Sequence, residues 1–393
     1  MRTSHRPKCP RCLPSLKPRP FSVIWILLTL GLSSSLGYSA DLFAKRSDLS
    51  LLLPTWNRFY TLSTEAGYKD NLLLGPNHRE VGGFNGVIGD FILWRRPVED
   101  RREFHVLLNG SYRHYWANRS VEHESEVLIL SRYSHPISSS WEWVSEFEGA
   151  YFDQVIDATL VDTAILRQQL KGMSQRLSSG LRWKVGPHSS IQLSPLITRL
   201  WLSSPFDNHS EYGGTLGWTE SYGARSEWKV DYTGRHRTFD SLTETTLTGS
   251  SIPGATRGYQ RHSIQLTDKH YWDDTRRWST LTRLAGEIGS DDGAGYWDYL
   301  RFRVQEGIQW SGRQWDFRLD VGWLHDSFPN QSISTSTSRE RTRSEITGSS
   351  RIERRFGEFT KAYLEFRHDQ SMASDPLERF VANTYIVGFL WDF

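Results

Sequence analysis

The stretch 300–323, LRFRVQEGIQWSGRQWDFRLDVGW, alternates apolar and polar residues through two runs that a short turn separates. In the first run the apolar side chains share one face: Leu300, Phe302, Val304, Ile308 and Trp310. The other face is polar: Arg301, Arg303, Gln305 and Gln309. In the second run Asp316, Arg318 and Asp320 oppose five apolar positions in the same way. A period of two residues is that of a β-strand with one apolar and one polar face, so this stretch predicts a β-hairpin.

The same alternation continues on both sides of this hairpin and fills the chain from residue 58 to residue 393. Turn residues separate the runs, and each run is long enough for a β-strand to cross a membrane, which takes about 9–11 residues. We predict strands at 58–68, 80–94, 102–116, 122–134, 141–153, 169–185, 189–201, 210–222, 226–239, 259–272, 276–289, 296–310, 313–325, 341–356, 358–369 and 377–393. The fold class expected is all-β: a transmembrane antiparallel β-barrel of about 16 strands.

The connections between these strands alternate in length. Short ones are expected at 136–139, 186–188, 223–225, 273–275, 311–312 and near 357. Long ones are expected at 69–79, 154–168, 240–258, 326–340 and 370–376. Short turns on one side and long loops on the other are the pattern of bacterial outer-membrane barrels. An even number of strands then places both termini on the side of the short turns, the periplasm.

Tryptophan is abundant, with 17 residues in the chain, and most of them flank the connections. One band lies near the short turns: Trp94, Trp141, Trp183, Trp228, Trp278, Trp310 and Trp315. A second band lies near the long loops: Trp116, Trp201, Trp272, Trp297 and Trp323. Two such bands are expected of a barrel that spans a bilayer, because indole rings favour the boundary between lipid and water.

The N-terminus has the layout of a secretory signal peptide: a basic region, the apolar run 21–32 and then small residues. We predict a signal peptide over 1–39, a periplasmic lead over 40–57 and the barrel over 58–393. The alternative is an uncleaved anchor. Cleavage would remove both cysteines and six basic residues, leaving 41 basic against 45 acidic residues and a net charge of −4. A mildly acidic mature chain argues against nucleic-acid binding.

The last residues, YIVGFLWDF, resemble the C-terminal insertion signal of outer-membrane proteins. Phe393 supplies the terminal aromatic, Trp391 the aromatic two positions earlier and Gly388 the glycine five before the end. Ile386 departs from the pattern, which has a polar residue there. The resemblance implies an outer-membrane protein of a Gram-negative cell, with membrane lipid and the barrel-assembly machinery as partners.

A second, shorter resemblance concerns 65–71, EAGYKDN, at the first predicted hairpin. It is similar to the opening hairpin of large porin-like outer-membrane barrels, some of which are linked to exopolysaccharide export. The alternative is a strand end followed by a good turn sequence, because Asp and Asn favour turns.

A barrel of this size leaves an aqueous lumen, and charged side chains belong inside it rather than in lipid. The residues predicted to line the lumen are Glu146, Glu148, Arg301, Arg303, Arg318, Asp320, Lys361, Glu365 and Arg367. They favour a porin-like channel for hydrophilic solutes. The alternatives are a component of polysaccharide export and a non-conducting structural or adhesin barrel. The oligomeric state does not follow from the sequence.

The connection 154–168 differs from the others because it is rich in Val, Ile and Leu. These residues could share one face of a short helix folded into the lumen, as the third loop of porins does. Asp153, Asp157 and Asp162 would then face arginines of the wall across a constriction. The alternative is a β-hairpin that extends the two flanking strands, which Val and Ile also suit.

No catalytic constellation stands out, so we do not expect an enzyme. Ser131, His105 and His262 are conceivable members of a hydrolase site, but matches of this kind arise easily in a serine-rich chain. The acidic turn Asp291-Asp292-Gly293 could contact calcium, yet a lone acidic turn is more often simply solvated. We expect no cofactor and no metal.

Overall fold

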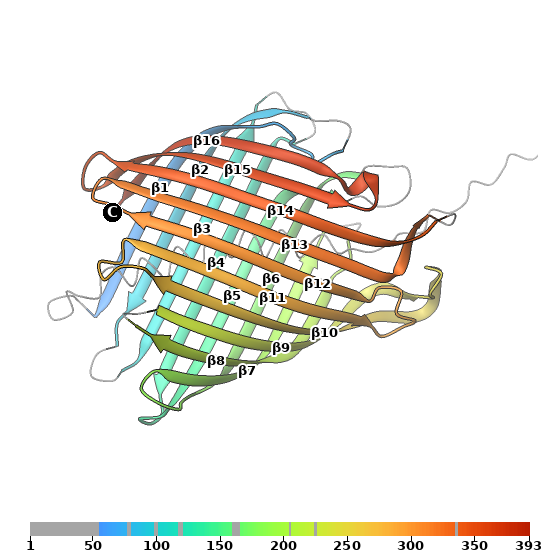
Figure 1. The fold of residues 1–393 in the computed structure, drawn as a ribbon, viewed down its shortest axis with the longest axis horizontal. Coiled ribbons are helices and arrows are strands. Elements are labelled where there is room, and N and C mark those ends of the chain that lie inside the picture. The colour runs from blue at the N-terminus through green and yellow to red at the C-terminus, as the bar shows by residue number, and fades with distance from the viewer. Residues whose placement is uncertain are drawn as a thin grey trace, which may run out of the picture.

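The structure, a computed structural model, describes residues 55–76, 80–97, 101–116, 121–158, 166–203, 206–223, 226–334 and 337–393. Each strand pairs in antiparallel fashion with the next along the chain, and β1 also pairs with β16. The sheet therefore closes into a barrel of sixteen strands, shown from the side in Figure 1. The predicted fold class is confirmed.

Most strands begin and end close to the predicted positions, but β5, β6, β9, β10, β13 and β14 are longer than predicted. Their bounds are β1 Trp56–Lys69, β2 Gly82–Arg95, β3 Glu103–Tyr115, β4 His123–Pro136, β5 Trp141–Ala158, β6 Leu166–Lys184, β7 Ser189–Leu202, β8 His209–Tyr222, β9 Ser226–Thr245, β10 Ser251–Tyr271, β11 Trp278–Asp291, β12 Tyr299–Ser311, β13 Trp315–Ser334, β14 Thr337–Arg355, β15 Thr360–Ala373 and β16 Phe380–Asp392. A short 3₁₀ helix, η2 (Pro376–Glu378), precedes β16. No helix within the described ranges is both long and apolar enough to cross a membrane.

The hairpin that decided the fold class is β12–β13. Ile308 lies opposite Leu319 and Trp310 opposite Phe317, so the apolar faces of the two runs form one surface. Cross-strand pairs of this kind stabilise a sheet by roughly 0.2–1 kcal/mol each. Because side chains alternate across a strand, this register also places the charged residues of both runs on the opposite surface.

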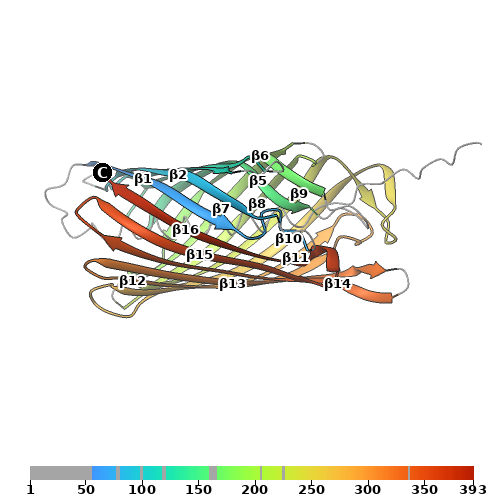
Figure 2. The ribbon, with the colours of Figure 1, turned by 90° about the horizontal axis from the view of Figure 1, so that it is seen from above.

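Three of the predicted long loops are mostly strand. β5 and β6 reach Ala158 and Leu166, β9 and β10 reach Thr245 and Ser251, and β13 and β14 reach Ser334 and Thr337. These hairpins extend from the barrel end opposite the C-terminus (Figures 1 and 2). The predicted loop character was wrong for 240–258 and 326–340, whereas the described part of 154–168 follows the hairpin alternative. Thr, Val and Ile favour strands, and continued pairing satisfies the backbone groups.

The outward face is apolar and rich in aromatic side chains. Trp141 and Trp183 stack across β5 and β6, and Trp278 lies beside Trp310 across β11 and β12. Three tryptophans depart from the predicted bands. Trp94 and Trp297 are buried, whereas Trp272 is 66% exposed beside the short β10–β11 turn rather than near a long loop. Trp94 occupies an inward position of β2, and Trp272 and Trp297 lie just outside strands, where alternation does not set the direction of a side chain.

The motif 65–71 lies at the seam where β1 meets β16. Asp70 accepts hydrogen bonds from the backbone N–H and the side-chain amide of Asn383, both at 2.7 Å. Asn71 is fully buried and donates to the carbonyl oxygen of Val381 at 3.0 Å. The Asp and Asn of this motif therefore hydrogen-bond to the start of β16 in addition to forming a turn.

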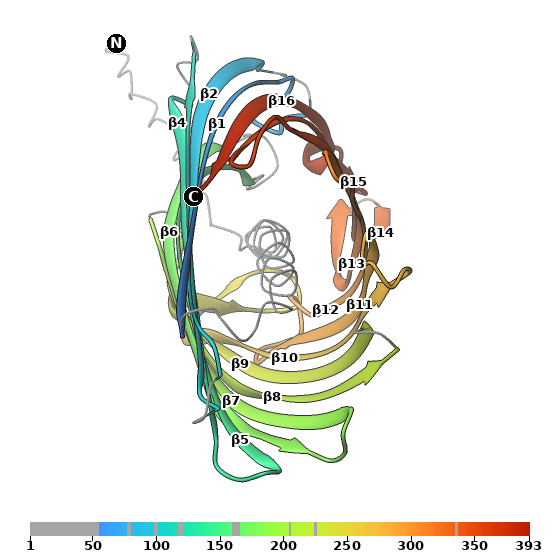
Figure 3. The ribbon, with the colours of Figure 1, turned by 90° about the vertical axis from the view of Figure 1, so that its left-hand side faces the viewer.

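The proposed signal peptide 1–39 lies outside the described residues, as does most of the predicted lead 40–57. β1 begins at Trp56, two residues before the predicted barrel boundary. Figure 3 looks along the barrel from the end where the C-terminus lies and shows the strands as a closed, elongated ring.

Candidate functional site

The interior surface of the barrel carries most of its ionisable side chains. On β12, outward Phe302 is 49% exposed while inward Arg301 is 7% exposed and paired with carboxylates. The same alternation holds from strand to strand because register pairs keep neighbours on one face. The barrel interior is therefore the candidate functional site.

A continuous set of ion pairs, the arginine–carboxylate chain, runs across six neighbouring strands. It consists of Glu211 on β8, Arg235 and Arg237 on β9, Arg261 on β10, Glu287 on β11, Tyr299 and Arg301 on β12, and Asp326 on β13. Each member occupies an inward position that the strand alternation provides. The chain joins strands side by side and covers a wide arc of the wall.

Glu211 is the most enclosed member, with no exposed surface. Its carboxylate accepts from Arg237 Nε at 2.6 Å and from Arg261 Nη1 at 3.0 Å. Arg235 Nη1 approaches the second carboxylate oxygen at 3.5 Å. Three guanidinium groups therefore share one carboxylate, and a buried charge of this kind is tolerated only because it is paired.

The other links of the chain are equally close. Arg261 Nη2 donates to both oxygens of Glu287 at 2.8 Å, and the Tyr299 hydroxyl donates to Glu287 at 2.6 Å. Arg301 binds Asp326 through two hydrogen bonds of 2.6 and 3.1 Å. Bidentate guanidinium–carboxylate geometry gives both strength and orientation. The wall in this arc is consequently a fixed array of charges.

A second group, the seam cluster, bridges β1, β3, β14 and β15. Glu65 on β1 accepts from Arg113 Nε at 2.7 Å and from the Tyr363 hydroxyl at 3.2 Å. The guanidinium of Arg351 lies 3.7 Å from the centroid of the Tyr363 ring. Ser63 shares a 3.0 Å hydrogen bond with the same hydroxyl. These contacts tie the first strand to the last strands from inside the barrel.

Opposite walls of the interior differ in the sign of their charges. The wall of β3 to β5 is mainly acidic, with Glu103, Glu124, Glu126, Glu142, Glu146 and Glu148 against Arg113 and Arg132. The wall of β9 to β12 is mainly basic, with Lys229, Arg235, Arg237, Arg261, Lys269, Arg283, Arg301 and Arg303 against Glu227, Asp231 and Glu287. β4 and β12 lie eight strands apart in a ring of sixteen, so the two walls face each other (Figure 3). This arrangement produces an electric field across the interior.

The residues predicted to line the lumen all occupy inward positions. Glu146 lies 3.7 Å from Arg132, and Arg318 Nε donates to Asp320 at 2.6 Å. The remaining ones are distributed over three strands: Glu148 on β5, Arg301 and Arg303 on β12, and Lys361, Glu365 and Arg367 on β15. Lys361 Nζ lies 3.3 Å from Asp392, and Glu365 binds both Arg351 and Arg367. They are not gathered in one spot but line the interior at several places.

The constriction aspartates do not lie where the inward-loop hypothesis placed them. Asp153 belongs to β5 and faces outward, with Lys171 Nζ at 3.1 Å and His123 Nε2 at 3.6 Å. The backbone of Asp157 pairs with Arg167 as part of the same hairpin, and Asp162 lies outside the described residues. The helical alternative is therefore wrong for 154–158 and 166–168, where the extended hairpin is observed. β-branched residues at 155 and 156 favour that outcome.

The three residues of the C-terminal signal lie on β16 or just beyond it. Trp391 faces outward beside Phe389, and Gly388 faces inward beneath the Tyr363 ring. Phe393 is 67% exposed, and its backbone exchanges hydrogen bonds with Tyr60 at 2.8 and 3.3 Å. The Phe393 side chain therefore adds little packing to the folded barrel.

Deletion of Phe393 is expected to lower the amount of inserted protein in cells while leaving refolding in detergent nearly intact. Its side chain is exposed, so its loss removes little stability, whereas an insertion signal would need it. Quantitative blotting of outer-membrane fractions measures the first effect, and refolding yield measures the second. Unchanged insertion in cells would show that Phe393 is not part of a signal.

Sequence reasoning missed the central residues of both clusters. Glu211, Arg261 and Glu287 were within predicted strands, whereas Asp326 was the first residue of a predicted loop. Alternation along the strands could have marked the first three as inward. Glu65 lay in the motif at 65–71, where only a turn or a family resemblance was considered. Their partners depend on the register between strands, which the sequence does not reveal.

The residues considered for catalysis are not brought together. Ser131 and His262 face outward on β4 and β10, and the Nδ1 of His262 shares a 2.7 Å hydrogen bond with Tyr232. His105 faces inward and lies 2.7 Å from Glu103. Asp291 accepts from the backbone N–H groups of Gly295 and Trp297, so its carboxylate organises a loop. Across the described ranges, no group of three His, Cys, Asp or Glu residues is arranged to hold a metal.

No protein-family model matches the sequence, and no curated protein matches it. Solved structures with a similar fold include OccAB1 of Acinetobacter baumannii, with a TM-score of 0.44 and 11% identity over 88% of this chain and 99% of that one. OprD of Pseudomonas aeruginosa gives 0.43 and 9% over 86% and 95%. A bacterial polysaccharide outer-membrane secretin gives 0.40 and 10% over 86% and 97%. At these values the fold rests on the strand pairing of this chain itself.

Proposed function

We propose that the chain is an outer-membrane channel that passes hydrophilic solutes through its charged interior, with both termini on the periplasmic side. The observation that carries the proposal is the closed ring of sixteen strands with apolar side chains outside and ionisable ones inside. A basic side chain facing lipid at mid-bilayer costs about 2–4 kcal/mol, so this distribution suits a membrane. Barrels of this strand number are wide enough to hold water.

The opposed acidic and basic walls support passage of polar rather than apolar solutes. A solute between them is exposed to carboxylates from β3 to β5 and to guanidinium groups from β9 to β12. Fixed charges in a narrow space of low dielectric constant concentrate ions and orient dipoles. Polysaccharide export and a purely structural or adhesive role are compatible with the same fold. The recording described next distinguishes them from a solute channel.

The test is single-channel recording with residues 40–393 refolded into a planar lipid bilayer, with a panel of salts and neutral solutes. A folded barrel is recognised by faster gel migration before heating than after, because its backbone hydrogen bonds are mutually satisfied. We expect stepwise ion conductance, permeation of small neutral solutes and exclusion of large polymers. Heat-modifiable protein without conductance would point to a structural or adhesin barrel. Passage of polysaccharide would point to export, and recovery in a soluble periplasmic fraction would exclude a membrane channel.

Replacing 156–165 with a Gly-Ser turn is expected to leave conductance and ion selectivity unchanged. The flanking strands continue as a paired hairpin up to Ala158 and from Leu166, and Asp153 binds outward partners. Recordings of the shortened and intact chains measure the effect, with the β9–β10 hairpin shortened at 245–251 as a control. A rise in conductance with weaker ion selectivity would show that the loop narrows the lumen after all.

A further inference from the structure

Gly322 interrupts the inward row of side chains on β13. The inward positions around it carry Asp320 and Leu324, and only backbone occupies position 322. Its register partners are Gln305 on β12 and Thr347 on β14, both inward. The lumen wall therefore has a shallow notch, at a place where polar side chains from both neighbouring strands meet.

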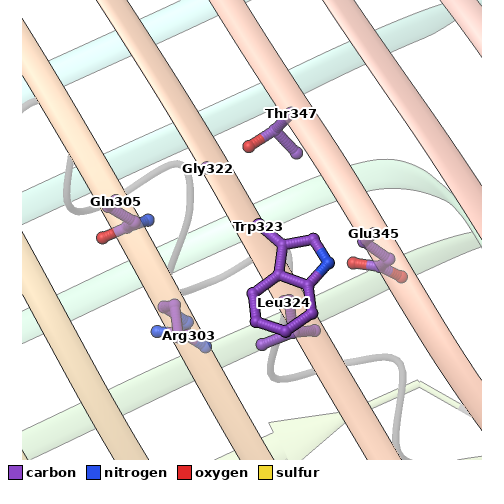
Figure 4. A pocket seen from close by; sticks show the side chains of 7 residues that line it. All are labelled: Arg303, Gln305, Gly322, Trp323, Leu324, Glu345 and Thr347. Atoms are coloured by element: carbon purple, nitrogen blue, oxygen red, sulfur yellow. The ribbon is translucent and has the colours of Figure 1, made fainter.

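The notch is part of a small pocket in the interior wall (Figure 4). It is lined by Arg303, Gln305, Gly322, Trp323, Leu324, Glu345 and Thr347. A Cβ atom at position 322 would lie 2.6 Å from Thr347 Oγ1 and 3.7 Å from Gln305 Cγ. A side chain at position 322 would therefore displace the Thr347 hydroxyl, and the pocket beside it has room for about one water molecule or one hydroxyl group.

The rim of the notch is chemically mixed. Arg303, Leu324 and Glu345 form one cross-strand row, so a guanidinium group and a carboxylate flank an apolar side chain. Gln305 and Thr347 add an amide and a hydroxyl directly beside the gap. Arg303 and Glu345 oppose each other in charge, and Glu345 is also paired with Arg343.

This mixture selects against simple ions and favours hydroxyl groups. An anion attracted by Arg303 is repelled by Glu345. A cation attracted by Glu345 is repelled by Arg303. A hydroxyl group donates one hydrogen bond and accepts others, so it can satisfy the amide, the hydroxyl and either charged group at once. Leu324 offers an apolar contact for the C–H groups that accompany hydroxyls on a sugar ring.

We propose that the Gly322 notch is a binding subsite for a hydroxyl group of a neutral polyhydroxylated solute of monosaccharide type. This inference rests on the proposed channel function, which supplies the solute to the interior. A passing sugar inserts one hydroxyl between Gln305 and Thr347 and displaces water from the notch. The subsite slows neutral sugars on their way through the lumen.

The experiment is single-channel recording of the refolded chain with glucose added at increasing concentration. Triethylene glycol dimethyl ether, a neutral solute without hydroxyl groups, is the comparison. We expect glucose to produce saturable current noise and the ether to produce only a proportional fall in conductance. Gly322→Val fills the notch, and Thr347→Val replaces the hydroxyl with a methyl group of similar size. Loss of one hydrogen bond should raise the half-saturating glucose concentration by about fivefold in Thr347→Val.

Two matched controls lie outside the notch. Gly307→Ala adds a methyl group at another inward glycine, and Ser349→Ala removes another inward hydroxyl. Both are expected to keep the glucose response, and heat-modifiable migration shows that every variant is folded. Absence of saturation in the unaltered chain, or the same response in all four variants, overturns the subsite while the channel stands. Absence of conductance in the unaltered chain overturns both.

Discussion

Replacing Glu211 with alanine is expected to lower the free energy of unfolding by about 3–5 kcal/mol. Glu211 has no exposed surface and is the shared counter-ion of Arg235, Arg237 and Arg261. Its removal leaves three guanidinium groups close together on a buried wall. The loss is large because an uncompensated buried charge is costly, whatever the net contribution of the intact cluster is.

Urea titration of the refolded barrel, followed by tryptophan fluorescence, measures this loss. The matched control is Asp320→Ala, which removes a carboxylate from the half-exposed pair with Arg318 and should cost at most about 1 kcal/mol. Glu211→Gln keeps one hydrogen-bond acceptor, the amide oxygen, without the charge, and its loss should fall between those of the other two variants. Equal losses for Glu211→Ala and Asp320→Ala would show that water or ions screen the Glu211 cluster.

The strands themselves were predictable because they depend on a local pattern. In 300–323 apolar and polar residues alternate through most of both runs, and the structure places the two sets on opposite faces of β12 and β13. Hairpin lengths were predicted less well. Residues 240–258 are rich in Thr, Ser and Gly, which suit loops and exposed strand edges alike, and only pairing between β9 and β10 separates the two.

The interior contacts were beyond the reach of the sequence for a different reason. The seam cluster joins Glu65 to Tyr363, residues that are 298 positions apart. Their meeting depends on the closure of β1 on β16 and on a register that aligns Glu65 with Gly388. Alternation gives the face on which a charge lies, but the neighbour of that charge follows from the cumulative register of all the strands.

The same register gives Gly388 a steric role that its place in the C-terminal signal did not suggest. Gly388 lies opposite Glu65 on one side and opposite Tyr363 on the other. The Tyr363 ring crosses the backbone of Gly388, and its hydroxyl reaches the Glu65 carboxylate. Glycine is required at this position because a side chain would occupy the path of the ring.

Replacing Gly388 with alanine is expected to lower the equilibrium ratio of closed, heat-modifiable barrel to unfolded chain by tenfold or more, an effect on the order of 1.4 kcal/mol or larger. The added Cβ would lie 2.4 Å from Tyr363 Cζ and 2.6 Å from its hydroxyl oxygen. The ring must then leave its place, and the contacts with Glu65 and Ser63 across the seam are lost with it. Gel migration before and after heating, on chain refolded in detergent at increasing urea concentrations, measures this ratio without the cellular machinery.

A second substitution separates the steric role of Gly388 from its role in a signal. Tyr363→Ala removes the ring, so the double variant Gly388→Ala with Tyr363→Ala no longer has a clash and should close better than Gly388→Ala alone. Tyr363→Phe keeps the ring but loses the hydroxyl, and it should be milder than either. If the double variant refolds no better than Gly388→Ala, the steric account of Gly388 is wrong. If it refolds well in detergent but still fails to insert in cells, then Gly388 has both roles, because assembly in cells depends on the glycine itself.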